Sequence, residues 1–249
     1  PVIGTVTQID IYGNNKWQMV FNTQEKLYVV DINGHYVDGF PVSLDYLATN
    51  PVSIIDYDLN KDYRFLVAGN DHRIHNYNIY GKKVRGWTLP KTDTIVSRQI
   101  QHFSVAGKDY IVVSENSGVI RFLNRRGEKR YKSIENIYVQ TNSELLVQKS
   151  YCIDSSSIVY IDSSNQLKKV FFGGEISNLD FSLDSNNIFH PFIYEPSVTN
   201  LINYGFISEN KLMIFGPENQ LYLDRESEYD LTNNIMIRNN YFILFNNKA

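Results

Sequence analysis

The sequence has little cysteine, no long apolar run and no large excess of either charge. Cys152 is the only cysteine among 249 residues. This excludes an internal disulfide framework, a cysteine-based zinc cluster and Cys-x-x-Cys redox chemistry. No apolar run approaches the ~18 residues of a membrane-spanning helix, so we expect no such span. The 24 basic and 27 acidic side chains give a net charge of −3, which offers no electrostatic reason to expect a nucleic acid as partner.

Residues that favour strands are abundant. The chain has 18 tyrosines and 14 phenylalanines, and 43% of its residues are hydrophobic. Convincing helical periodicity is absent, so we expect an all-β fold. A chain of this length is compatible with one all-β domain over residues 1–249. The expected strands outside the repeat described next are 6–11, 17–21, 52–58, 63–68, 99–105, 110–114 and 201–207.

A repeated pattern is the most informative feature of the sequence. It consists of an apolar strand, an Asp or Asn, two further residues, and a Gly or Asn that ends the turn. The Asp or Asn can accept hydrogen bonds from nearby backbone amides, and the Gly supplies the positive φ of a tight hairpin. The spacing averages roughly 46 residues, near the length of a four-stranded propeller blade. The five copies end at Gly34, Gly81, Gly127, Asn165 and Asn219.

An aromatic residue follows three of these turns by six positions. These residues are Phe40, Trp87 and Phe171. Sheets that stack face to face need bulky side chains between them. We therefore expect these aromatics to pack between neighbouring sheets.

The segments LYVVDINGHYVDGFPVSL and RIHNYNIYGKKVRGWTLP resemble the repeat of bacterial PQQ-like and WD40-like β-propeller proteins. The resemblance covers residues 4–224 and implies a propeller of about five to six four-stranded blades. Residues 231–249 would supply part of a sixth blade, or the chain is a piece of a larger propeller. The resemblance to quinoprotein-type propellers is confined to the blade pattern. Their disulfide of adjacent cysteines cannot form with Cys152 alone, so we expect no catalytic residues and no quinone cofactor.

Residues 56–62 place oxygen-bearing side chains at alternate positions. Calcium loops collect their ligands from one segment in this way, and the segment also resembles the loop of FG-GAP-type propeller repeats. The alternative is a hairpin turn whose side chains cap backbone amides. Lys61 and Arg64 favour the turn, because each puts a cation where the loop would have a glycine or a carboxylate. The candidate calcium ligands are Asp56, Asp58, Asn60 and Asp62.

Two basic runs occupy equivalent positions in the second and third repeats, so neighbouring blades would bring them together on an outer rim. Such a patch suits an acidic partner or a polyanion. The alternative is a solvated surface that protects strand edges from pairing. The candidate partner-binding residues are Lys82, Lys83, Arg85, Arg125 and Arg126.

The histidines show no catalytic pattern. His72 and His75 are three residues apart, which in a strand places them on opposite faces. His35, His102 and His190 lie in different repeats without a matched carboxylate. We expect all five at turn tips or strand surfaces.

Because the repeat is clear and each catalytic constellation is incomplete, we expect a non-catalytic scaffold that binds a protein or a carbohydrate. A bacterial cell-envelope or secreted location is favoured over the cytoplasm. One alternative is an enzyme, for example one that acts on glycans, with its site in the central channel. Another is a structural segment of a larger protein.

Overall fold

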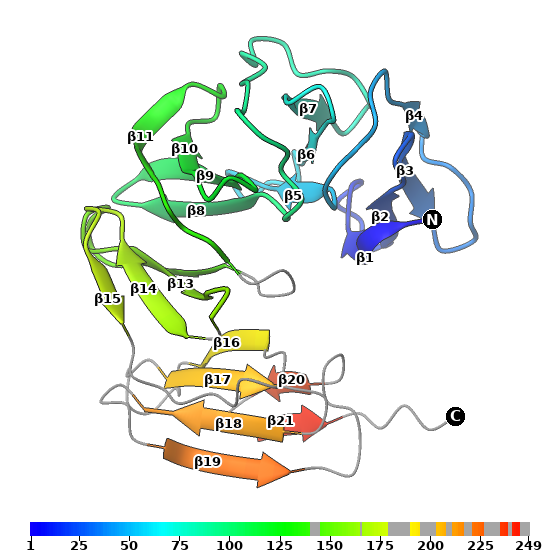
Figure 1. Cartoon of the computed structure of the whole chain (residues 1–249). Coiled ribbons are helices and arrows are strands. Elements are labelled where there is room, and N and C mark those ends of the chain that lie inside the picture. The colour runs from blue at the N-terminus through cyan, green and yellow to red at the C-terminus, as the bar shows by residue number, and fades with distance from the viewer. Residues whose placement is uncertain are drawn as a thin grey trace. The chain divides into compact units, whose positions relative to one another are not determined.

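A computed structural model describes the chain as strands joined by turns, with no helix among the described residues (Figure 1). No described helix is therefore long and apolar enough to cross a membrane. The expected all-β class is confirmed. The structure describes residues 1–139, 145–164, 166–178, 190–194, 203–207, 211–216, 221–226, 235–238 and 241–244.

The described strands form antiparallel sheets in which consecutive strands pair. Sheet 1 has four strands: β1 (Ile3–Ile9), β2 (Gln18–Asn22), β3 (Lys26–Asp31) and β4 (Val42–Ser43). Sheet 2 has three: β5 (Ser53–Ile55), β6 (Arg64–Ala68) and β7 (Ile74–Asn78). Sheet 3 has four: β8 (Gln101–Val105), β9 (Lys108–Ser114), β10 (Ile120–Leu123) and β11 (Lys129–Ile134).

The second half of the chain continues the same pattern. Sheet 4 comprises β12 (Leu146–Gln148), β13 (Ser157–Ile161), β14 (Leu167–Phe171) and β15 (Ile176–Asn178). Sheet 5 comprises β16 (His190–Tyr194), β17 (Asn203–Ile207), β18 (Lys211–Phe215) and β19 (Leu221–Glu226). A final pair consists of β20 (Ile235–Arg238) and β21 (Tyr241–Leu244).

The four-stranded unit is thus confirmed in four sheets, and sheet 2 departs from it. Its fourth strand is reduced to two isolated bridges, Tyr77 with Lys83 and Arg73 with Lys91. The chain divides into two compact units, Pro1–Ile137 and Tyr138–Ala249. The first unit contains sheets 1 to 3. A single domain over residues 1–249 stays a prediction.

The repeated turn is confirmed after the third strand of sheets 1 to 3. The amide of Asp31 donates to the carbonyl of His35 over 2.9 Å, and Asn78 and Asn124 make the same bond four residues ahead. Each of these side chains also accepts two backbone amides within its turn. The glycine that follows has a φ of 82° at Gly34, and Gly81 and Gly127 match it.

The expected fourth copy of the repeat, which ends at Asn165, does not follow the third strand of its sheet. Asp162 follows β13, the second strand of sheet 4, and its turn connects β13 to β14. The equivalent turn follows β14, where the amide of Phe171 donates to the carbonyl of Glu175 and Gly174 has a φ of 102°. Phe171 therefore precedes its turn and does not hold the position that Phe40 and Trp87 hold, so its packing between sheets stays a prediction. Asn165 and Asn219 lie outside the described residues.

The other two aromatics pack as expected within the first unit. Phe40 is buried and meets Phe65 of β6 edge to face, with ring centroids 5.8 Å apart. Trp87 packs against the buried cluster that sheets 2 and 3 share, and its indole N–H donates to the carbonyl of Ile74 over 2.7 Å. These contacts fill the space between neighbouring sheets.

Two glycines allow the closest backbone approach between sheets 1 and 2. A Cβ on Gly39 would lie 2.2 Å from the carbonyl oxygen of Tyr80, and a Cβ on Gly81 would lie 2.2 Å from that of Gly39. Both glycines have positive φ. The turn that carries Tyr80 is therefore held against sheet 1 by a contact that no side chain fits.

We expect Gly39→Ala to destabilise the chain more than Gly86→Ala. Gly86 holds the equivalent position in sheet 2, has a φ of 83° and has nothing within 4 Å of an added Cβ. An alanine there costs about 1–2 kcal/mol through its left-handed backbone. At Gly39 the steric overlap adds roughly 1–3 kcal/mol. Urea unfolding of both variants measures the difference, and equal losses would contradict the close contact.

Candidate functional site

Consecutive strands run antiparallel, so every second connection lies at the same end of a sheet. At one end, the first strand connects to the second and the third connects to the fourth. We call this end of the first unit the turn rim. It comprises the loops 10–17, 56–63 and 106–107 and the turns 31–35, 78–82 and 124–128. It carries both groups of residues that the sequence singled out.

Two loops of the turn rim have the same construction. The Asp10 carboxylate accepts the amides of Asn14 and Asn15, both over 3.0 Å. Asp56, 46 residues later, likewise accepts the amides four and five residues ahead, over 3.1 and 2.8 Å. Positive φ occurs at matching positions, at Gly13 and Leu59 and again at Asn15 and Lys61. Both loops are turns capped by an aspartate.

The candidate calcium ligands all take part in other contacts. The amide oxygen of Asn60 accepts the amide of Asp62 over 3.1 Å. Asp62 forms a two-pronged pair with Arg64 over 2.5 and 2.8 Å. Asp58 pairs with Arg125 over 2.8 Å. In the part of the chain that the structure describes, no group of three or more His, Cys, Asp or Glu side chains could hold a metal ion. The calcium loop stays a prediction.

Lys61 joins the two equivalent loops. Its ammonium lies 2.5 Å from the Asp10 carboxylate, whose side chain is only 3% exposed. The hydrogen bond from Lys61 lowers the pKa of Asp10, and the same bond raises the pKa of Lys61. The lysine thus places a positive charge beside a buried carboxylate of the preceding sheet.

Arg125 makes a similar link between sheets 2 and 3. Its guanidinium pairs with Asp58 over 2.8 Å and with Asp109 over 2.5 Å, and it lies 4.7 Å from the ring centre of Tyr57. Burial alone would raise the pKa of Asp109, but hydrogen bonds from Ser104, Arg125 and His102 hold it below its usual value. The contacts of Arg125 are therefore with its own chain.

The other four candidate partner-binding residues are exposed on the turn rim or next to it. Lys83 pairs with Asp45 over 3.0 Å. Arg126 lies 3.5 Å from Glu128. Lys82 and Arg85 have no acidic partner among the described residues. Whether any of these residues binds a partner stays a prediction.

Two grooves open on the turn rim between consecutive sheets. Groove A has a volume of about 480 Å³ and groove B about 180 Å³. Asn60 and Asp62 line both grooves, so the two are adjacent. Groove A is lined by Ile11, Tyr12, Gly13, Asn60, Lys61, Asp62, Ile79 and Tyr80. Groove B is lined by Tyr57, Asp58, Asn60, Asp62, Arg64, Val84 and Arg125.

The sequence reasoning missed the exposed apolar side chains beside these grooves. Tyr12 is 60% exposed, Tyr80 64% and Leu59 89%. The signal that could have found them is the match of residues 10–15 to residues 56–61, which shows that both loops project from the same end of neighbouring sheets. Tyr12 and Tyr80 also line groove A, so exposed aromatic side chains and a groove occur together at this end of the first unit.

The structure corrects the interpretation of the histidines. Three of them have an aspartate partner: His35 with Asp31 over 3.5 Å, His75 with Asp71 over 3.0 Å and His102 with Asp109 over 2.8 Å. His75 is 4% exposed, which is not a surface position. Of the remaining two, His72 lies in a turn rather than a strand, and the side chain of His190 is outside the described part.

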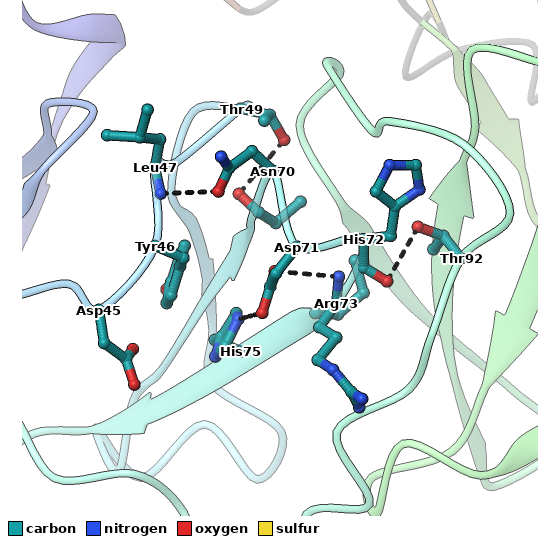
Figure 2. A network of polar contacts seen from close by, with 12 residues as sticks. Asp45, Tyr46, Leu47, Thr49, Asn70, Asp71, His72, Arg73, His75 and Thr92 are labelled. Atoms are coloured by element: carbon teal, nitrogen blue, oxygen red, sulfur yellow. Dashed lines mark hydrogen bonds and ion pairs between the residues drawn. The ribbon is translucent and has the colours of Figure 1, made fainter.

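Figure 2 shows the surroundings of His75, at the end of sheet 2 opposite the turn rim. Its ring stacks on Tyr46, with centroids 3.7 Å apart, while His72 points away from it. Burial lowers the pKa of His75, despite the neighbouring Asp71. The histidine is therefore neutral at pH 7, because its pKa lies below the usual ~6.5.

The Asp71–His75 pair has counterparts in the next two sheets. In each, an acidic residue of the turn after the second strand pairs with a basic residue at the second position of the third strand. The counterparts are Glu115 with Arg121 in sheet 3 and Asp162 with Lys168 in sheet 4. The pairs recur with the repeat, which indicates that they close these turns.

We expect Arg125→Ala to lower the free energy of unfolding by about 1–2 kcal/mol, because it leaves Asp109 without a cationic hydrogen-bond donor and the pair is partly exposed. Arg126→Ala, the neighbouring substitution, should change it by about 0.5 kcal/mol or less. Urea unfolding checks both. A loss at Arg126 as large as that at Arg125 would contradict the structural role of Arg125.

We expect calcium to leave the melting temperature unchanged, because the oxygens of residues 56–62 accept backbone amides or pair with arginines. Thermal unfolding in excess calcium and in chelator makes the comparison. Magnesium serves as the control ion. A calcium-specific rise that Asp58→Asn abolishes would instead establish the calcium loop.

The comparisons with solved structures give the fold. The chain is similar to BBS1N, solved in complex with ARL6DN and soaked with lead, at a TM-score of 0.65 and 11% identity over 93% of this chain and 83% of that one. It is similar to the Pan2 WD40 domain of Neurospora crassa at a TM-score of 0.60 and 11% identity, over 96% of this chain and 69% of that one. It is also similar to the dihydro-heme d1 dehydrogenase NirN at a TM-score of 0.58 and 9% identity, over 91% of this chain and 47% of that one.

No protein-family model and no curated protein matches the chain. At these identities the similarities establish fold and leave activity open. The repeated antiparallel sheets and the neighbours agree. The chain has a β-propeller fold, similar to that of the Pan2 WD40 domain.

Proposed function

We propose that the chain is a non-catalytic propeller scaffold that binds a protein partner through the turn rim of its first unit. The observation that carries the proposal is the concentration of grooves A and B, exposed aromatics and exposed cations at that end of sheets 1 to 3. Aromatic residues and arginine are enriched where protein interfaces are strongest.

A histidine group of the described residues resembles a hydrolase triad, and its geometry supports a non-catalytic interpretation. Ser104, His102 and Asp109 lie together, but the serine hydroxyl donates to Asp109 over 2.7 Å. The histidine Nε2 faces the same aspartate over 2.8 Å. A nucleophilic serine needs the histidine as its base. Here both side chains serve to hold the aspartate that Arg125 also contacts.

The structural neighbours favour the same class of function. BBS1N was solved in complex with another protein, ARL6DN. Rigid propellers with variable loops are suited to such contacts, because the scaffold positions the loops. The proposal also includes two more specific properties of the chain. It is a bacterial propeller of the PQQ-like group, and it is located in the cell envelope or secreted. Both rest on the resemblance of the repeat.

Site-specific photocrosslinking tests the proposal. A photoreactive phenylalanine derivative replaces Lys82 on the turn rim or, as the control, Lys91 near the opposite end of sheet 2. The full chain is then irradiated in envelope and soluble extracts of its source. We expect a discrete protein adduct from position 82 and none from position 91. Equal adducts from both positions, or none from position 82, would overturn the proposal.

A further inference from the structure

We propose that the partner presents an acidic segment with one large apolar side chain, and that groove A receives this side chain while Lys82, Arg85 and Arg126 meet the acidic residues. The inference rests on the proposed function and adds the chemistry of the partner. It follows from the lining of groove A, the charge around it and the conformation of Leu59.

Groove A is large enough for one large side chain, and its lining is mixed, with more polar than apolar surface. Its volume of about 480 Å³ lies within the ~300–1,000 Å³ of ordinary ligand sites. Ile11, Tyr12, Ile79 and Tyr80 supply its apolar lining. The two charged residues of the lining are already paired, Lys61 with Asp10 and Asp62 with Arg64. An apolar occupant therefore leaves no unpaired charge behind.

Groove A is lined by residues of the acidic stretch 1–81, and the chain that follows the groove is basic. Residues 82–137 contain 12 basic and 5 acidic side chains, a net charge of +7, whereas residues 1–81 contain 5 and 9, a net charge of −4. Lys82 and Arg85 are exposed and have no acidic partner among the described residues. The exposed pair of Arg126 with Glu128 is long, at 3.5 Å, and exchanges at little cost. The exposed cations Lys82, Arg85 and Arg126 attract carboxylates.

Lys82 lies beside groove A, and Arg85 and Arg126 lie next to residues that line the adjacent groove B, Val84 and Arg125. Lys82 follows Tyr80 by two residues in the same turn. The carbonyl of Arg126 accepts the amide of Thr88 over 2.9 Å, which ties the next turn to the chain just after Arg85. One extended segment can therefore contact the groove and the cations together.

Leu59 supplies an independent argument. It has a φ of 54°, occupies the position that Gly13 holds in the preceding loop, and is 89% exposed. A leucine in the left-handed region is strained, and this one buries almost none of its surface within the chain. The neighbouring residues Asp58 and Asn60 line the grooves. A partner that covers this loop would give the leucine side chain its contacts.

A randomised dodecapeptide display library, selected on the full chain, tests the inference. We expect the enriched peptides to share an excess of Asp and Glu and one Trp, Phe or Leu. The best peptide is then synthesised and its affinity measured by fluorescence anisotropy at two salt concentrations. Binding should weaken as salt rises, because exposed charges are screened over about 10 Å at 0.1 M.

Variants of the chain then locate the binding surface. Tyr80→Ala and the double substitution Lys82→Glu with Arg85→Glu should each weaken binding by about 10- to 30-fold. Leu59→Gly should weaken binding without lowering the melting temperature, a result that a purely structural leucine would not give. The matched controls are Tyr151→Ala, outside the first unit, and Arg73→Glu with Lys91→Glu near the opposite end of sheet 2. Both should bind as the unmodified chain does.

Three outcomes would overturn the inference: enriched peptides without an acidic excess, no enrichment at all, or equal binding by rim and control variants. A heparin oligosaccharide that binds the rim where the peptides do not would replace the acidic protein segment with a polyanion. If position 82 still crosslinks a protein in any of these cases, the proposed function stands and only the chemistry assigned to the partner fails.

Discussion

The structure of the first unit depends on how closely the turn of one sheet approaches the sheet before it. The backbones of Gly39 and Gly81 are too close to admit a side chain. The next turn also packs closely, but against side chains, since a Cβ on Gly127 would lie 2.8 Å from the Thr88 hydroxyl and 3.2 Å from the Trp87 ring. These contacts hold the turns at fixed positions. The grooves of the turn rim, and the side chains beside them, are arranged by this packing.

Charged residues strengthen the same contacts between sheets. Lys61 reaches Asp10 of the preceding loop, and Arg125 reaches Asp58 in the same direction along the chain. A carboxylate that is 3% exposed needs a cation or several donors. In the loop of sheet 1 the lysine of the next sheet supplies the cation. A loop can therefore have oxygen-bearing side chains at the spacing of a calcium loop while lysine and arginine side chains of the protein supply the positive charge.

Local patterns were predicted well and pairings across a hairpin were not. The turns at Gly34, Gly81 and Gly127 follow from an Asx residue and a positive φ within a few positions. An Asx residue whose amide bonds four residues ahead also occurs one strand earlier in sheet 4, at Asp162, over 2.9 Å. Only the spacing distinguishes this turn from the repeated one. Gly34, Gly81, Gly127 and Gly174 follow one another at intervals of 47, 46 and 47 residues. The aspartate partners of the histidines were missed because hairpins create those pairs.

Leu59 of the turn rim differs from the other residues whose backbone conformation or close contacts are unusual. Gly39, Gly81 and Lys61 each have a compensating contact within the chain. Leu59 has a strained backbone and an exposed side chain at once, and nothing within the described structure offsets either cost. A glycine stands at the equivalent position of the neighbouring loop, so the turn itself does not need a leucine. The proposed partner would supply the missing contact by covering this loop.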